Sequence, residues 1–260
     1  MKGKISNIFQ NQMTYPKVSI ITVTYNAAAE LRKTLENISR SNYPCFEVIV
    51  IDGASSDGTG EVINEFSETI DQWVSEPDKG IYDAMNKGLR YASGEYVWFI
   101  NAGDKIHRPE SITRIFDDNP QEADIYYGET LIRSESGDVL GLRKKKLPEN
   151  LTWRSFRRGM VVCHQSILVR REIVPEYNPA YRYAADVEWV LLSLQRARTI
   201  VNTHTILSEF VLGGVSTRHR KASLRERYAI MKKYFGIFVT SLAHLGFVFD
   251  AFKPPFRKVK

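Results

Sequence analysis

Residues 46–59 read FEVIVIDGASSDGT, and this stretch carries the pattern on which the fold depends. The apolar, β-branched run Phe46–Ile51 predicts a strand that is buried on both faces. Asp52-Gly53 closes the strand with a turn, because aspartate and glycine both favour tight turns. A helix is expected from about Thr59 to Phe66. The order strand, turn, helix is the unit from which helix-covered parallel sheets are built.

The segments on either side repeat this unit. Further strands are expected at 17–24 (KVSIITVT), 72–74 and 96–100 (YVWFI), and further helices at 31–39 and 80–91. The fold class is therefore α/β, with a mostly parallel central sheet flanked by helices. In such sheets the ligand lies beyond the carboxyl ends of the strands. The polar residues that follow the strands should share that edge: Tyr25-Asn26, Asp52-Gly53, Glu76–Asp78 and Asn101–Asp104.

The pattern changes after Asp124. The runs 125–127, 130–133 and 139–142 predict small antiparallel strands around a turn at 136–138. One more strand is expected at 165–169 and a helix at 186–194. These strands are too few for a core of their own, so this part should complete the site of the first part.

Composition limits the possible classes of protein. Of 260 residues, 43% are hydrophobic and 25% are charged, which is typical of a folded globular chain. The two cysteines, Cys45 and Cys163, cannot form a disulfide framework and indicate a reducing compartment. No apolar run before Pro16 resembles a secretory signal, so the cytoplasm is the expected location.

The net charge of +6 belongs to the end of the chain. Residues 201–260 carry 11 Lys and Arg against 3 Asp and Glu, whereas the rest carries 25 against 27. This distribution argues against a nucleic-acid partner for the main body and favours an anionic surface as partner of the tail. Residues 234–249 contain no charged side chain, but a membrane span needs about 20 apolar residues. An interfacial helix on an anionic membrane and a helix packed on the domain both remain open.

Asp52 and Asp104 each end a predicted strand. Asp52 is placed to accept hydrogen bonds from a nucleotide base or ribose, or only to stabilise the turn. No GxGxxG motif follows the first or second strand, which argues against a dinucleotide site. Asp104 suits a hard divalent cation that bridges phosphates, or only a helix cap.

Two helix starts carry further candidates. In the helix that begins near Gly80, the side chains of Asp83, Asn86 and Lys87 share one side, either facing a phosphate or as a solvated face. In Ala184-Ala185-Asp186-Val187-Glu188, the first carboxylate is either a general base or a helix cap.

Five segments together resemble family 2 glycosyltransferases, which have the Rossmann-like GT-A fold. They are VSIITVTYN, IDGASSDGT, EPDKGIYDAMNKG, NAGD and AADVEW, and they span about Lys17 to Leu194. The chain is most similar to bacterial surface-polysaccharide transferases of the colanic acid type, which share the motif Cys163-His164-Gln165.

The resemblance implies a division of the chain. Residues 1–16 would be an N-terminal extension and 17–217 the GT-A domain, with a nucleotide-sugar half (17–104) and an acceptor half (105–217). Residues 218–260 would form a basic and apolar C-terminal helical tail.

The resemblance also implies roles for single residues. Asp186 matches the catalytic base, with Glu188, His164 and Gln165 supporting the base or the acceptor. Asp104 matches the last acid of the metal motif, for Mn²⁺ or Mg²⁺, while Asn101 and Gly103 replace its other acids and Gly53 replaces a second nucleoside-binding Asp. The residues implied to bind the nucleotide sugar are Thr24, Tyr25, Asn26, Asp52, Asp83, Asn86, Lys87, Asn101 and Gly103.

The implied reaction is an inverting transfer from a nucleotide-diphosphate sugar to a saccharide or lipid-linked acceptor, in surface polysaccharide synthesis. The enzyme would lie in the cytoplasm or peripherally on the inner face of the cell membrane. A non-catalytic sugar- or nucleotide-binding relative would keep the fold but lose the base, and Asp186 is present. A sugar-phosphate nucleotidyltransferase would show a Gly-rich, basic loop after the first strand, where this chain has Tyr25-Asn26-Ala-Ala-Ala.

Overall fold

The structure is a computed structural model, and it describes residues 15–119, 121–213, 219–250 and 254–259. Most of the expected N-terminal extension and the first residue of the expected tail, Arg218, lie outside these ranges.

The centre of the fold is a parallel sheet in the order β3-β2-β1-β4. Its strands are β1 (Val18–Thr24), β2 (Phe46–Asp52), β3 (Gln72–Ser75) and β4 (Tyr96–Phe99).

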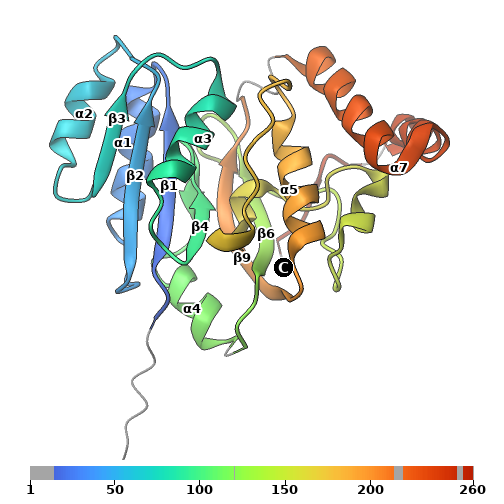
Figure 1. The fold of residues 1–260 in the computed structure, drawn as a ribbon, viewed down its shortest axis with the longest axis horizontal. Coiled ribbons are helices and arrows are strands. Elements are labelled where there is room, and N and C mark those ends of the chain that lie inside the picture. Colours follow the sequence, from blue (N-terminus) through green and yellow to red (C-terminus); the bar gives the residue numbers. More distant parts are fainter. Residues whose placement is uncertain (1–14, 120, 214–218, 251–253, 260) are drawn as a thin grey trace, which may run out of the picture.

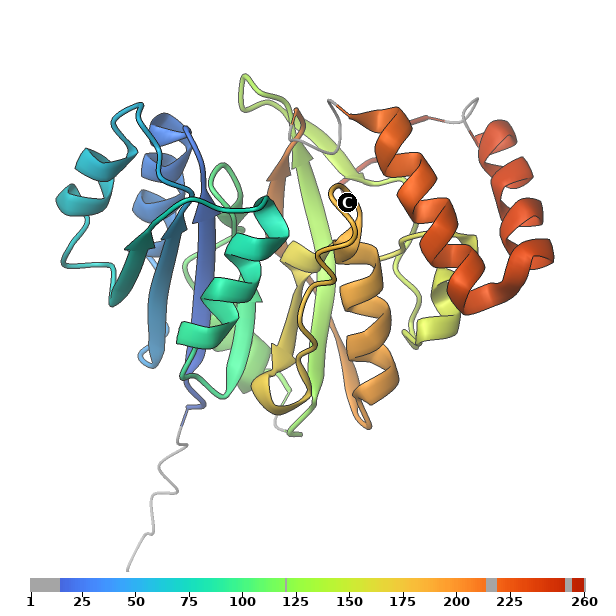
Figure 2. The same cartoon turned by 45° about the horizontal axis from the view of Figure 1, so that its top comes forward.

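Helices cover both faces of the sheet, as its doubly buried strands require. On one face α1 (Ala28–Ile38), α2 (Thr59–Glu65) and α4 (Ser111–Asp117) contribute side chains to one buried apolar cluster. On the other face α3 (Ile81–Tyr91) and α5 (Ala185–Arg196) contribute to a second cluster. Figure 2 shows α3 and α5 on the same side of the sheet, with the segment that precedes α5 between them. The strand and helix order expected for residues 17–104 is confirmed.

The antiparallel part is more extensive than the sequence suggested. Residues 125–133 form one strand, β6, and not two short ones, and β6 continues into β7 (Val139–Arg143) through a turn. β8 (Ile167–Arg170) joins β6 to β4, and a short helix, η2 (His164–Ser166), replaces the expected start of that strand. The sequence analysis missed β5 (Lys105–Ile106) and the twelve-residue β9 (Ile200–Val211), which pairs with both β5 and β6.

The C-terminal region packs on the domain. Helix α7 (Arg220–Asp250) contacts α5 and the short helix η1 (Trp153–Arg158), and the rings of Trp153 and Phe235 stack at 5.6 Å. After α7, β10 (Phe256–Arg257) pairs with β7 and so extends the sheet. Figure 1 shows α7 beyond α5, at the side of the molecule opposite to α2. Within the described ranges, no helix has the length and apolarity that crossing a bilayer requires.

Helix α7 contains a sharp bend at Gly236, whose φ of +78° favours glycine. The hydroxyl of Tyr228 lies 3.1 Å from that of Ser241, and the Tyr228 and His244 rings are 4.9 Å apart. The two halves of the helix therefore fold back on each other as a hairpin, which Figure 2 shows. The tip of this hairpin carries exposed apolar side chains: Ile237, Phe238, Val239 and Leu242.

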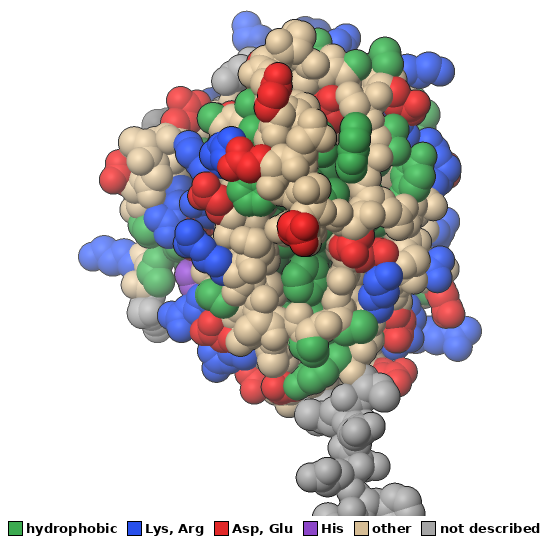
Figure 3. Space-filling view, turned by 90° about the vertical axis from the view of Figure 1, so that its left-hand side faces the viewer, with side chains coloured by type: hydrophobic (Ala, Val, Ile, Leu, Met, Phe, Trp, Pro, Cys, Tyr) green, Lys and Arg blue, Asp and Glu red, His purple; other side chains and the backbone are tan. Residues whose placement is uncertain are grey.

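The face at the other end of the molecule is different. Figure 3 shows acidic, basic and apolar side chains interspersed on the side that carries α2 and β3. This mixture agrees with the near-neutral charge of residues 1–200.

Candidate active site

The carboxyl ends of β1 and β2 carry two residues in an unusual backbone conformation. Asn26 (φ +45°) and Ala54 (φ +62°) are non-glycine residues in the left-handed region. The backbone N–H of Asn26 donates to the Ser55 hydroxyl at 2.7 Å, and its side-chain oxygen accepts from the N–H of Ser56 at 2.9 Å. Such strained positions cluster at functional sites, and these two share one sheet edge.

Asp52 ends β2 and is only 2% exposed. Its carboxylate accepts hydrogen bonds from the N–H and the hydroxyl of Ser55, and from the Ser75 hydroxyl at 2.6 Å. Asp52 therefore fixes the turn after β2 and ties it to β3. A ligand that binds Asp52 would therefore share its carboxylate with Ser55 and Ser75.

At Gly53 the segments that follow β1, β2 and β3 lie close together. A Cβ atom at this position would lie 2.9 Å from an Asp78 carboxylate oxygen and 3.1 Å from the Tyr25 ring. A second aspartate at position 53 would therefore collide with Asp78, whose own carboxylate stands beside this strand end. Tyr25 is 65% exposed at the same edge. Asp78 is thus a candidate for nucleoside binding that the sequence analysis did not single out.

The polar residues of α3 are engaged within the protein. The Lys87 ammonium is buried and bonds to Asp78 at 2.6 Å and to Glu76 at 2.9 Å. Burial alone would lower the pKa of Lys87, but these two partners outweigh it and raise the pKa. Asn86 makes two hydrogen bonds to the backbone of Tyr177, and Asp83 accepts from the N–H of Lys79.

Lys87 thus holds the loop that precedes α3, and Asn86 holds the segment around Tyr177. Asp83, which is partly exposed, closes the turn that precedes the helix. A direct contact of these three side chains with the nucleotide stays a prediction.

The turn after β4 is fixed by α1. The Thr34 hydroxyl donates to the Asp104 carbonyl at 2.9 Å and accepts from the N–H of Gly103. This arrangement buries the Asp104 carboxylate, which is 4% exposed and accepts from the Gln165 amide at 3.1 Å. Burial raises the pKa of Asp104 to about 7, although Gln165 and His164 act in the opposite direction. The side-chain oxygen of Asn101 is buried and has no hydrogen-bond partner in the described part of the chain.

The motif at 163–165 brings the two ends of the site together. Gln165 contacts Asp104, whereas the His164 ring reaches Asn101 at 3.5 Å through Nε2 and Asp186 at 3.7 Å through Nδ1. Residues 101–104, 164–165 and 186 therefore form one cluster. The cluster joins the carboxyl end of β4 to the start of α5.

Asp186 lies in the first turn of α5, with its side chain 15% exposed. The expected alternative of a helix cap is wrong, because Ala184 is the N-cap residue and no side chain caps this helix. Burial raises the pKa of Asp186, but His164 at 3.7 Å, the charge of Arg227 and the Tyr82 hydroxyl together lower the pKa below its usual value. Asp186 therefore stays ionised at neutral pH.

Glu188 points elsewhere. Its carboxylate accepts from Lys233 at 2.8 Å, Tyr234 at 3.1 Å and Asn178 at 2.9 Å. Two of these donors belong to α7, so Glu188 fastens the C-terminal helix to α5. The expected role of Glu188 beside the base stays a prediction.

Comparison with known proteins identifies the family of this chain. The model of the family "Glycosyl transferase family 2" matches residues 19–177, which include the strand ends described above and His164. The chain belongs to glycosyl transferase family 2. A PGL/p-HBAD biosynthesis glycosyltransferase of Mycobacterium bovis is 28% identical over 217 residues, which cover 78% of this chain and 80% of that protein.

Solved glycosyltransferase structures share the fold, so this family 2 enzyme has the GT-A architecture. Staphylococcus aureus TarS 1-349, in complex with UDP-GlcNAc, has a TM-score of 0.65 at 19% identity, over 88% of this chain and 66% of TarS. The mannosyltransferase PcManGT of Pyrobaculum calidifontis, in complex with GDP-Man and Mn²⁺, has a TM-score of 0.56 at 15% identity. That likeness covers 93% of this chain and 82% of PcManGT.

Tyr82 is a site residue of this glycosyltransferase that the sequence analysis missed. Its hydroxyl donates to Asp186 at 3.3 Å, and its ring stacks on Tyr177. Tyr177 stacks in turn on Trp189, one turn of α5 beyond Asp186, with 5.2 Å between ring centroids and 5° between planes. This stack fixes α5 against α3. The signal lay in the sequence, because Tyr82 directly precedes Asp83 in the EPDKGIYDAMNKG segment.

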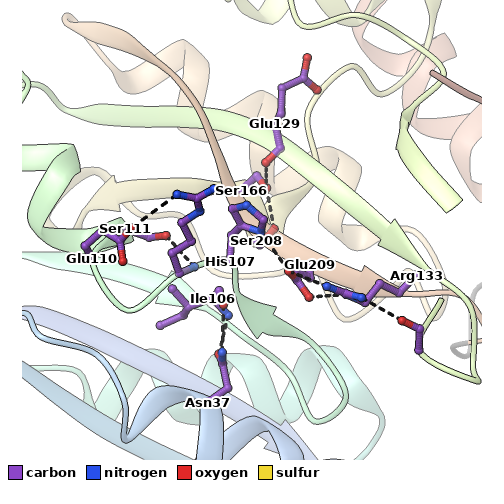
Figure 4. Close-up of polar contacts among 12 residues, drawn as sticks. Asn37, Ile106, His107, Glu110, Ser111, Glu129, Arg133, Ser166, Ser208 and Glu209 are labelled. Carbon is purple, nitrogen blue, oxygen red and sulfur yellow. Dashed lines mark hydrogen bonds and ion pairs between the residues drawn. The ribbon is translucent and has the colours of Figure 1, made fainter. Parts of the chain in front are cut away.

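The glycosyltransferase has a second polar cluster in the segment that follows Asp104, where β5 pairs with β9 (Figure 4). The Glu209 carboxylate accepts from the His107 ring at 2.9 Å and from the guanidinium of Arg133. Burial raises the pKa of Glu209, but His107 and Arg133 outweigh it and lower the pKa to about 2. This cluster fastens the segment after Asp104 to β9 and β6.

Proposed function

We propose that the enzyme transfers a sugar from a nucleoside diphosphate sugar to a saccharide hydroxyl with inversion. In this single displacement the acceptor oxygen attacks the anomeric carbon, while the bond to the diphosphate breaks. Asp186 takes the proton of the attacking hydroxyl as the new bond forms. The observation that carries the proposal is the cluster that joins Asp186, through His164 and Gln165, to Asp104.

The choice of base rests on the difference between the two carboxylates of α5. Asp186 has one hydroxyl donor and a histidine at 3.7 Å, and it faces the residues that end β4. The Glu188 carboxylate is occupied by three donors and is only 3% exposed. The Tyr82 hydroxyl and the His164 ring hold the Asp186 carboxylate in one orientation. Less free energy is then needed to bring the carboxylate into the geometry that the reaction requires.

Nucleotide binding is proposed for the edge formed by β1, β2 and β3. Tyr25 presents an exposed ring for stacking on the base, and Asp52 and Asp78 offer carboxylates beside Gly53. The Thr24 hydroxyl is buried, and it has no hydrogen-bond partner in the described ranges. Asn26 shapes this edge through its contacts with Ser55 and Ser56.

A divalent cation, Mn²⁺ or Mg²⁺, fits the residues at the end of β4. The unpartnered oxygen of Asn101 and the buried Asp104 carboxylate are hard oxygen donors, which these cations prefer. The described residues contain no group of three or more His, Cys, Asp or Glu side chains arranged for a metal. Substrate phosphates and water would therefore complete the coordination. When bound, the cation would neutralise negative charge on the departing diphosphate.

The acceptor is proposed to be a saccharide, free or lipid-linked, of a surface polysaccharide. Support comes from the likeness to surface-polysaccharide transferases in the motifs that include Cys163-His164-Gln165, and from the exposed apolar tip of the α7 hairpin. We place the enzyme in the cytoplasm, peripherally on the inner face of the cell membrane. The tip and the basic residues of the tail would contact anionic lipid there.

A thermal-shift panel tests nucleotide and metal binding. UDP-, GDP- and dTDP-sugars are measured with and without MnCl₂, on the wild-type chain and on Asp104→Ala. One nucleotide class should raise the melting temperature, with a manganese-dependent part that Asp104→Ala abolishes. Glu122→Gln, whose side chain is 86% exposed at the opposite edge of the sheet, is the control and should behave as wild type. A manganese-dependent shift that survives in Asp104→Ala would remove Asp104 from the metal site.

A further inference from the structure

Helix α7 turns one face toward the domain. Ser223, Ile230 and Met231 on this face are 4%, 0% and 2% exposed. Arg227 lies between them at the same helical spacing, since i, i+4, i+7 and i+8 share one side of a helix. A cationic side chain therefore occupies the middle of the buried face.

The Nε atom of Arg227 lacks the kind of partner that the neighbouring charged groups have. Arg227 is partly exposed, but its Nε atom is buried, and no hydrogen-bond acceptor for this atom lies in the described part of the chain. By contrast, the Glu226 carboxylate accepts from the backbone N–H groups of Arg182 and Tyr183 at 2.9 and 2.7 Å, and Lys233 pairs with Glu188. A buried N–H group without an acceptor costs free energy, which an anion that accepts from it would recover.

The position of Arg227 relates it to the proposed base. Its positive charge acts on Asp186 and on Tyr82, the two residues that face each other at the start of α5. Because Arg227 belongs to α7, it approaches Asp186 from the side opposite to the nucleotide half. Figure 1 shows α5 lying between α7 and the strands of that half. An anion bound by Arg227 would therefore be carried by the acceptor.

The surroundings of Arg227 are strongly basic. Tyr183 stacks on His219 at 4.9 Å, which brings the loop before α5 against the start of α7. The exposed cations of these two segments are Arg182, Arg220, Lys221 and Arg225. Glu226 is the one acid in residues 181–183 and 219–227, and it already accepts two backbone hydrogen bonds. Clustered charge of one sign concentrates ligands of the opposite sign.

We propose that Arg227 binds a phosphate or carboxylate group of the acceptor, next to the hydroxyl that Asp186 deprotonates. The acceptor is accordingly an anionic saccharide or a saccharide phosphate. This inference rests on the proposed function, because it takes Asp186 to mark the acceptor side of the site. A guanidinium suits the role because it offers two parallel N–H donors to one oxyanion.

The test measures anion binding to the full chain in the presence of MnCl₂ and of the nucleotide that stabilises it. Methyl phosphate and glucuronate are titrated into wild type, Arg227→Met, Arg227→Lys and the control Arg225→Met, which removes an exposed arginine from the same helix. At least one anion should bind wild type, and Arg227→Met should weaken it by about 10- to 100-fold. Arg227→Lys should retain part of the affinity, and Arg225→Met all of it.

Stability and nucleotide binding separate the other outcomes. Arg227→Met should melt close to the wild-type temperature, because it removes one buried N–H group without an acceptor and keeps the apolar stem. Unchanged anion affinity in Arg227→Met would overturn the inference. If Arg227→Met loses nucleotide affinity and keeps anion affinity, Arg227 belongs to the donor diphosphate, and the inference is overturned as well. Wild-type protein that binds nucleotide but neither anion would overturn the inference alone. Wild-type protein that binds no nucleotide would overturn the proposed function.

Discussion

The nucleotide half and the acceptor half hold their polar side chains in different ways. At the edge formed by β1, β2 and β3 the partners come from neighbouring strand and turn segments: Ser55 lies three residues from Asp52, Ser75 lies 23 from Asp52, and Asn26 lies 29 from Ser55. Around Asp186 and Glu209 the partners include much more distant ones, since Tyr82 and Asp186 are 104 residues apart and His107 and Glu209 are 102 apart. Successive strand and turn segments therefore build the nucleotide edge, whereas packing of distant segments assembles the residues around Asp186.

Two buried carboxylates, one in each half, are held by different kinds of partner. Asp104 receives a neutral amide from Gln165, and its pKa is raised to about 7. Glu209 receives His107 and Arg133, and its pKa is lowered to about 2. A buried carboxylate without a counter-charge suits a ligand site, and a fully paired one suits the scaffold. The following predictions test whether this division holds.

The largest effect is expected for Asp186→Asn. The substitution keeps the size of the side chain but removes the base, so the transfer rate should fall by about 10²- to 10⁴-fold. Nucleotide affinity should be unchanged, because Asp186 lies outside the edge formed by β1–β3. The measurements are the transfer rate at saturating donor and the melting temperature.

Glu188→Gln is the matched control on the same helix. It should lower the melting temperature, because it weakens the ion pair with Lys233, and leave the transfer rate within a few-fold of wild type. Near-normal turnover of a folded Asp186→Asn protein, together with an inactive Glu188→Gln protein, would exchange the roles of the two carboxylates.

The parts of the molecule that the sequence predicted are those built by local pattern. Continuous apolar runs identified β1, β2 and β4, and the turn residues after them marked the edge with Asp52 and Asp104. His164 and Gln165 were found only through the motifs of the family, whereas Asp186 also stood out as the first carboxylate of its helix. Nothing in the spacing of the three residues shows that they approach Asp104. The structure brings them together through the pairing of β8 with β4.

The rest depended on contacts that no local pattern contains. In β9 the apolar and polar residues do not alternate regularly. The strand also contains His204 at φ +54°, in the region where its register with β6 shifts. Its β-branched residues therefore did not show a strand pattern in the sequence. Asp186 was expected to be the base and Glu188 its support because both begin one helix, and only the packing of α7 shows that Lys233 and Tyr234 bind Glu188. Arg227 was one of many basic residues of the tail until the helix face that it occupies was known.

A smaller effect, on stability, is expected for Glu209→Gln. The lowered pKa of Glu209 means that its pairing stabilises the fold above about pH 4.5, and that this contribution is lost as pH falls toward 2. The substitution should therefore cost on the order of 2–3 kcal/mol of unfolding free energy at pH 7. The loss should shrink steadily below pH 4.5.

Urea unfolding at several pH values between 7 and 3 measures this difference. Thr113→Val, which removes an exposed hydrogen bond of α4 to Asn42, is a control without a titrating group. A cost for Glu209→Gln that is the same at pH 7 and pH 3 would mean that the ion pairs of Figure 4 do not stabilise the fold.

The smallest effect is expected at the tip of the α7 hairpin, where the acceptor half would meet the membrane. Phe238 is 89% exposed and Leu242 is 72% exposed, so neither contributes much to the folded core. Burial of a phenylalanine or leucine side chain in an apolar environment is worth about 1.5–3 kcal/mol. Phe238→Ser should therefore lower partition onto vesicles of phosphatidylglycerol and phosphatidylcholine by about tenfold, without lowering the melting temperature.

Val139→Ser, which changes a half-exposed apolar residue of β7 away from the tip, is the control and should leave partition unchanged. High salt should weaken binding of every variant, since the basic tail contributes through charge. If Phe238→Ser and wild type float equally with anionic vesicles, the tip does not insert, and the apolar side chains of 237–242 serve another contact.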